Sequence, residues 1–260
     1  MPADAPAAPA SITETPSIPG RIPRGDFVAE QGNASVDAST VSRGDVSEVP
    51  LDHVPAGIVV GTTAHELFGG PASTYPSLGD IATAVGSCTK CALYKTAKKP
   101  VPGEGSARAQ LVCVGEAPGA VEDETGRPFV GPAGQLLDKI LAAIKLSRSD
   151  VFICNVLKHR PPGNRNPMPD EVQACSPYLV RQIELLQPKV IVAFGTFAAQ
   201  TLLNTKESIG KLRGRIHRYY GVPLVVTYHP AALLRNPGWK RPTWEDVQLA
   251  RRLLDRDVRS

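Results

Sequence analysis

Three polar side chains and a pair of cysteines carry the chemistry that this 260-residue sequence offers. Glu116, Asn155 and His229 each stand at or directly after the end of a short apolar run. A carboxylate can act as a base or stabilise positive charge, an amide offers a donor and an acceptor, and an imidazole can donate a hydrogen bond to a developing anion. Cys88-x-x-Cys91 has the spacing of a metal or redox site rather than that of a disulfide framework.

The apolar runs before these residues predict the strands of a parallel sheet. Helical patterns alternate with the strands, which is typical of a sheet covered on both faces. We expect an α/β fold with three layers, α/β/α, around a central four-stranded, mainly parallel sheet. Ligands bind beyond the carboxyl ends of such strands, so Glu116, Asn155 and His229 are expected to share one cleft. The expected strands cover residues 111–114, 151–155, 190–194 and 224–228, and the expected helices cover 133–146, 168–186, 196–203 and 244–254.

Charge separates an acidic leader from a basic body. Residues 1–75 are rich in Pro and Ala and carry 3 Lys or Arg against 9 Asp or Glu. Residues 76–260 carry 26 against 16, a balance of +10 that suits a polyanion such as nucleic acid and equally suits a slightly basic enzyme. We expect a disordered tail over 1–75 and one catalytic domain over 76–260, long enough to form a substantial core.

Several protein classes are excluded by the apolar pattern. No apolar run approaches the roughly 20 residues that span a bilayer, and no secretory signal is readable. The five cysteines are an odd number, and Cys113 and Cys154 lie within apolar runs as expected core residues. The sequence therefore predicts an intracellular, cytoplasmic protein with no membrane partner. We also expect the protein to be a monomer.

Four ordered blocks between about residues 85 and 256 carry a resemblance. They are Gly115-Glu-Ala-Pro-Gly-Ala-Val-Glu-Asp123 with residues 126–134, then 155–167, 212–215, and His229-Pro-Ala-Ala-Leu-Leu-Arg235. In this order and spacing they resemble the family 4 uracil-DNA glycosylases. The resemblance implies a base excision repair enzyme that hydrolyses the N-glycosidic bond of uracil in single- or double-stranded DNA and leaves an abasic site. No Lys is placed to form a Schiff base, so strand cleavage is not expected.

The resemblance also implies roles for the site residues. Asn155 matches the amide that reads uracil, and Phe129 matches the aromatic ring that stacks on the flipped base. His229 is expected to donate a hydrogen bond to uracil O2 as the bond breaks. Ala117 is expected in the substrate pocket, where the better-known first family has Asp. Glu116 is therefore the candidate for the carboxylate that orients water and stabilises the sugar cation.

DNA contacts are expected in the last block and on the basic surface. Leu233, Leu234 and Arg235 match a loop that enters the minor groove, and one of the two leucines is expected to be buried in a short helix instead. Phosphate contacts would make the affinity fall with salt. The candidates are Arg160, Arg165, Arg213, Arg215, Lys240 and Arg241.

A metal cofactor is implied by the same family. Its members hold a [4Fe–4S] cluster on four cysteines, and Cys88, Cys91 and Cys175 match three of them. His159 stands at the other position, and imidazole can ligate such clusters. The first hypothesis is a cluster on these four residues; zinc on the same set and no metal are the alternatives.

Other functions remain as competing hypotheses. A branch of this superfamily traps uracil-DNA through a histidine on an inserted basic loop, but residues 159–175 carry no insertion and no second histidine. A turnover enzyme is therefore favoured over an iron–sulfur protein that binds or traps uracil-DNA. A small-molecule α/β hydrolase is the third hypothesis, and it predicts no affinity for DNA.

Overall fold

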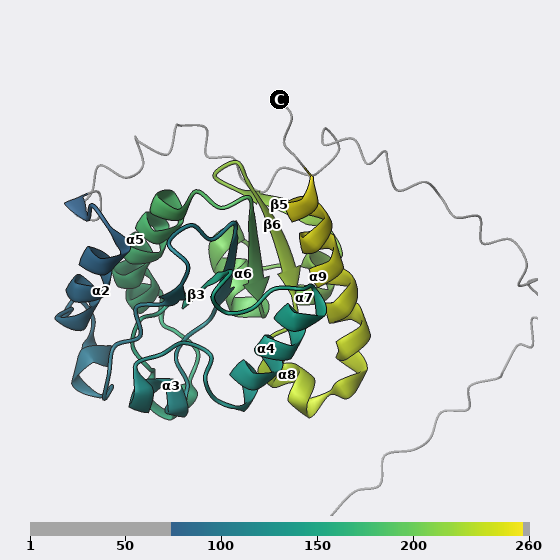
Figure 1. The fold of residues 1–260 in the computed structure, drawn as a ribbon. Helices are drawn as coiled ribbons and strands as arrows, with labels where there is room; N and C mark the ends of the chain where they lie inside the picture. The colour runs from purple at the N-terminus through teal and green to yellow at the C-terminus, as the bar shows by residue number, and fades with distance from the viewer. Residues whose placement is uncertain (1–73, 257–260) are drawn as a thin grey trace, which may run out of the picture. The chain divides into compact units, whose positions relative to one another are not determined.

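The computed structural model describes residues 74–256, so almost all of the predicted tail over 1–75 lies outside the described residues. Helices lie on both faces of one sheet (Figure 1), which confirms the three-layer α/β/α prediction. Within the described residues, no helix is both long enough and apolar enough to cross a membrane.

The sheet has six strands in the order β1-β3-β2-β4-β6-β5. The four central strands are parallel and correspond to the four predicted ones, while the two edge strands are antiparallel and were not predicted. The strands are β1 Glu104–Gly105, β2 Leu111–Gly115, β3 Phe152–Asn155, β4 Val190–Phe194, β5 Ile216–Tyr219 and β6 Val222–Thr227.

The central strands β2, β3 and β4 are buried along their whole length, and β6 is buried from Leu224 to Thr227, because both faces of the sheet are covered. Val112 and Val114 of β2 join the core beneath α5 (Pro169–Leu186) and α6 (Thr196–Leu203), whereas Leu111 and Cys113 join the core beneath α4 (Pro132–Ala143) and α9 (Lys240–Asp255). Cys154 of β3 is also fully buried, in agreement with its expected core position. The helices are α2 Leu78–Gly86, α3 Ala120–Thr125, α4 Pro132–Ala143, α5 Pro169–Leu186, α6 Thr196–Leu203, α7 Ile209–Leu212, α8 Pro230–Arg235 and α9 Lys240–Asp255, with 3-10 turns at Ala92–Lys95, Pro162–Asn164 and Pro237–Trp239.

Two helix boundaries differ from the sequence prediction by more than one residue. Helix α4 ends at Ala143 rather than at residue 146, because Lys145 adopts a positive φ of 60° that ends the helical path. Helix α9 begins at Lys240 rather than at Trp244. Pro242 lies in its first turn, where the missing N–H has no helical partner to lose.

The strand register brings the functional segments to one edge of the sheet. Gly115, the last residue of β2, pairs with Asn155, the last residue of β3. Phe194 of β4 pairs with Thr227 of β6, two residues before His229. Asp246 of α9 fixes this end of β6, since its buried carboxylate accepts a hydrogen bond of 2.8 Å from the Thr227 hydroxyl.

Candidate active site

A cavity of about 390 Å³ opens at the carboxyl ends of the parallel strands. The predicted catalytic and substrate-binding residues all line it, together with two of the predicted DNA-contacting arginines. The lining residues are Glu116, Ala117, Pro118, Gly119, Glu122, Phe129, Ala133, Asn155, Pro161, Asn164, Arg165, Asn166, His229, Ala231, Ala232 and Arg235.

Asn155 forms a fixed, nearly buried part of the cavity wall. Its side-chain oxygen Oδ1 is buried and has no hydrogen-bond partner among the described residues. Lys158 holds the backbone of Asn155 in place. Its Nζ donates one hydrogen bond of 2.8 Å to the Asn155 backbone carbonyl and another of 2.8 Å to Gln182 Oε1. An unpaired buried acceptor is costly unless a ligand supplies the donor. Asn155 therefore suits a ligand that presents an N–H group.

Gly115 permits the close packing around this amide. A Cβ at position 115 would lie 2.4 Å from Asn155 Oδ1 and 2.5 Å from the Phe129 ring. Any side chain at position 115 would push these two groups apart. The amide and the ring thus meet because the strand before them ends in glycine.

His229 is held as a neutral hydrogen-bond donor. Its Nδ1 accepts a hydrogen bond of 3.1 Å from the Ala231 N–H at the start of α8, so Nε2 carries the ring proton. Burial, with a smaller contribution from the nearby Arg235 guanidinium, lowers the pKa of His229 to about 4. At neutral pH the imidazole is uncharged and can donate only through Nε2.

Glu116 contributes one of the two carboxyl groups that line the cavity, and Glu122 contributes the other. Its backbone carbonyl accepts a hydrogen bond of 3.1 Å from Leu157 N–H, which extends the pairing of the two strand ends. Burial raises the pKa of the Glu116 carboxyl above its usual value. The site thus combines a carboxyl group that is costly to ionise with an imidazole that is costly to protonate.

Phe129 presents an aromatic ring beside His229, with 5.4 Å between the ring centroids. Its backbone has a positive φ of 52°, which is unusual for a bulky residue. Glu122, to which the sequence analysis gave no role, accepts hydrogen bonds of 2.9 Å from the N–H groups of Val130 and Gly131, the two residues after Phe129. The only sequence signal for Glu122 was the acidic pair after the Gly115–Gly119 turn.

The segment that forms the cavity matches a known protein family. The profile of the "Uracil DNA glycosylase superfamily" matches residues 102–250, which include every residue that lines the cavity. The chain belongs to the uracil DNA glycosylase superfamily.

Curated relatives agree with this assignment. A type-4 uracil-DNA glycosylase of Archaeoglobus fulgidus is 49% identical over 169 residues, which are 62% of this chain and 85% of the relative. A type-4 enzyme of Thermotoga maritima is 42% identical over 181 residues, 68% of this chain and 94% of the relative. A type-5 uracil-DNA glycosylase of Pyrobaculum aerophilum is 34% identical over 157 residues, 54% of this chain and 69% of the relative.

The predicted DNA-contacting loop of this uracil DNA glycosylase domain forms α8. Leu233 is 1% exposed and packs in the interior, so it does not face a ligand, whereas Leu234 is 51% exposed. The burial of one leucine in a short helix agrees with the alternative raised from the sequence. Arg235 is exposed at the rim of the cavity.

Some of the other residues predicted to contact phosphate are paired with side chains of the protein, and others are exposed. Arg165 pairs through both terminal nitrogens with the buried carboxylate of Glu171. Arg160 donates a hydrogen bond of 2.8 Å to Asn164 Oδ1. Arg215 is exposed. Two of these arginines are therefore bound within the protein. Of the remaining candidates, Arg213 pairs with Asp246, whereas Lys240 and Arg241 are exposed.

The predicted cluster ligands lie at different depths. Cys88 and Cys91 are half-buried, whereas Cys175 and His159 are buried. Burial raises the pKa of Cys175 to about 11 and lowers the pKa of the His159 imidazole. Within residues 74–256, no group of three or more His, Cys, Asp or Glu side chains is arranged to hold a metal ion. The thiols suit an iron–sulfur cluster, but the four predicted ligands are not assembled into one site.

Proposed function

We propose that this chain is a DNA repair enzyme, a uracil-DNA glycosylase of the type-4 kind. It hydrolyses the N-glycosidic bond of uracil in DNA and leaves an abasic site. The observation that carries the proposal is the buried, unpaired Oδ1 of Asn155 beside the aromatic ring of Phe129 and the Nε2 donor of His229. The identity with type-4 and type-5 uracil-DNA glycosylases supports it.

Recognition begins with a base that leaves the DNA stack, because its edge and its glycosidic bond are inaccessible within a duplex. The Asn155 oxygen accepts a hydrogen bond from uracil N3–H, and the amide nitrogen donates to uracil O4. The flat uracil ring stacks on Phe129, which is buried and lines the cavity. The pairing satisfies an acceptor that has no partner among the described residues.

The chemical step separates charge between the base and the sugar. The bonding electrons between C1′ and N1 pass to uracil, and negative charge spreads to O2. His229 Nε2–H donates a hydrogen bond to that oxygen, and a neutral imidazole performs this role without a proton transfer. The Glu116 carboxylate stabilises the positive sugar, orients the water that adds to C1′ and takes up the proton that this water loses, while uracil leaves as its anion. The cavity lining contains no Lys, which supports hydrolysis without strand cleavage.

The DNA approaches this pocket across α8. Leu234 is the exposed apolar side chain that can fill the gap left by the flipped base. Arg235 and Arg215 contact phosphates, and Arg160 and Arg165 add positive potential from fixed positions. We assign catalysis to one domain over residues 76–260 and none of it to the tail over 1–75. The substrate is uracil-containing DNA, and the enzyme acts as a monomer.

The cofactor in this proposal is a [4Fe–4S] cluster with Cys88, Cys91 and Cys175 as ligands and His159 as the fourth. The match of these four positions to the ligand positions of the type-4 family, to whose members the chain is 42–49% identical, supports it. When bound, the cluster supplies a covalent link between the segment of Cys88 and Cys91 and helix α5. It is a structural element, because none of its four ligands lines the cavity.

The direct test of the function is excision from a labelled oligonucleotide that carries one uracil. The products are divided and run on a denaturing gel with and without hot alkali. We expect cleavage only after alkali, because excision leaves an alkali-labile abasic site. A shifted band that survives denaturant would instead identify a covalent trap, and no product from folded protein would refute the enzyme.

The fall in kcat/KM at low pH should be caused by protonation of the Glu116 carboxylate. Its pKa is raised above 4.5 by burial, whereas that of His229 lies at about 4. As the pH falls, the carboxylate therefore gains its proton while the imidazole is still neutral, and kcat/KM should fall with a midpoint above pH 4.5. Glu116→Gln should be slower at pH 7 by on the order of 100-fold and should lack this fall at low pH. An unchanged fall in Glu116→Gln would contradict the assignment.

The cofactor assignment predicts iron and acid-labile sulfide at about four of each per chain after anaerobic purification. His159→Cys should keep or raise the iron content, and Cys175→Ala should lower it. Cys113→Ala is the control, because Cys113 is buried in the sheet. Zinc in place of iron, no metal in the parent protein, or loss of all iron in His159→Cys would each refute the proposed ligand set.

A further inference from the structure

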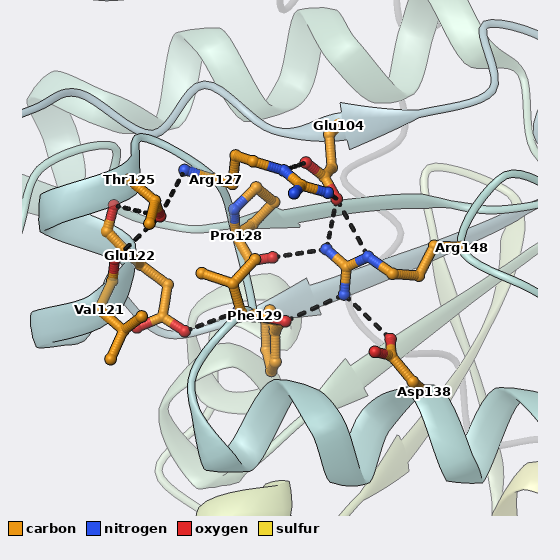
Figure 2. Close-up of polar contacts among 10 residues, drawn as sticks. Glu104, Val121, Glu122, Thr125, Arg127, Pro128, Phe129, Asp138 and Arg148 are labelled. Atoms are coloured by element: carbon orange, nitrogen blue, oxygen red, sulfur yellow. Dashed lines mark hydrogen bonds and ion pairs between the residues drawn. The ribbon is translucent and has the colours of Figure 1, made fainter.

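Arg148 is bound to the backbone segment that carries Phe129 (Figure 2). The residue lies between α4 and β3, and no sequence pattern singled it out. Its Nη1 donates a hydrogen bond of 3.0 Å to the Phe129 carbonyl, and its Nη2 donates one of 2.7 Å to the Pro128 carbonyl. One guanidinium therefore holds two successive carbonyl groups next to the pocket.

The guanidinium is itself fixed by two carboxylates. Nε donates a hydrogen bond of 3.0 Å to Glu104 Oε1, and Nη1 donates one of 3.1 Å to Asp138 Oδ1. The Arg148 side chain is only 21% exposed. A planar fork with several donors in fixed directions can serve all of these acceptors, which a lysine ammonium cannot do in the same geometry.

The segment held in this way has a strained conformation. Phe129 has a positive φ of 52°, and such a conformation persists in a bulky residue only when its surroundings fix it. On the far side, Glu122 accepts hydrogen bonds from the next two N–H groups. Gly134 of α4 leaves room for the Phe129 carbonyl, since a Cβ there would lie 1.7 Å from that oxygen.

We propose that Arg148 is a positioning residue for uracil excision, which acts by holding the Phe129 ring where the flipped base must stack. The inference rests on the proposed function, because that function places a flipped uracil base against the Phe129 ring. Arg148 does not line the cavity, so it acts only through the backbone of the residue that does. A ring fixed in advance spares the enzyme the cost of ordering it when the base arrives.

The chain offers a matched control in Arg127. This residue also binds Glu104, with Nε 2.7 Å from Oε2 and Nη2 3.1 Å from Oε1. Its side chain is 62% exposed, and the Pro128 and Phe129 carbonyls receive their side-chain hydrogen bonds from Arg148 instead. Arg127→Met therefore removes an ion pair to Glu104 and leaves the carbonyl contacts intact.

The test is single-turnover excision of uracil by the full chain. Arg148→Met should slow excision by on the order of 10- to 100-fold, because a small misplacement of a substrate-positioning group has effects of that size. Arg148→Lys should recover part of the loss, and Arg127→Met should stay within about twofold of the parent. In a Phe129→Ala background, Arg148→Met should cause little further loss, since the ring it positions is gone. Thermal unfolding of each variant shows that the compared proteins are folded.

Two results would overturn the inference. One is an equal loss from Arg148→Met with and without the Phe129 ring, which would mean that Arg148 acts elsewhere. The other is an equal loss from Arg127→Met, which would mean that only charge matters. If the parent protein does not excise uracil at all, the proposed function fails, and the positioning claim is judged separately.

The positioning claim can be tested without excision activity by fluorine NMR of the protein labelled with 4-fluorophenylalanine. The sequence has six Phe residues, and Phe129→Leu identifies the resonance of interest by its loss. We expect one sharp signal for Phe129 in the parent and in Arg127→Met, and a broadened or divided signal in Arg148→Met. A sharp, unshifted signal in a folded Arg148→Met would contradict the positioning role without any reference to activity.

Discussion

The pocket depends on one close approach, in which Gly115 at the end of β2 lies against the Asn155 amide and the Phe129 ring. The parallel register pairs Gly115 with Asn155, so the two strands end side by side. A Cβ at position 115 would come within 2.4 Å of the amide oxygen. Close packing of the sheet therefore buries an acceptor that no group of the described residues satisfies, and the other groups of the site are arranged around it.

The electrostatics of the site follow from the same burial. Burial opposes the charge on both Glu116 and His229, so it raises the pKa of Glu116 and lowers that of His229 to about 4. At neutral pH the imidazole is uncharged, so the two residues offer a carboxyl group and a neutral donor rather than an ion pair. This combination suits a reaction that develops positive charge on a sugar and negative charge on its leaving base.

Sequence patterns were sufficient for the parts of the fold that carry a strong local signal. The four central strands are continuous apolar runs, and their polar ends predicted that Glu116, Asn155 and His229 would meet. The edge strands β1 and β5 are short and only partly buried, so they carry no such signal. Arg148 was missed because its role depends on contacts with carbonyl groups about 20 residues away in the chain. Likewise, the sequence does not reveal which of Leu233 and Leu234 faces the interior.

The central claim is that the Asn155 amide recognises the base that this enzyme removes. Its most direct test is the single-turnover rate of uracil excision by the parent protein and by Asn155→Ala, with affinity for abasic-site DNA measured in parallel. We predict that Asn155→Ala slows excision by on the order of 100-fold or more, because the amide's pairing with the base is lost. Affinity for abasic DNA, which contains no base to recognise, should stay within about threefold. Near-normal excision by Asn155→Ala would contradict the claim.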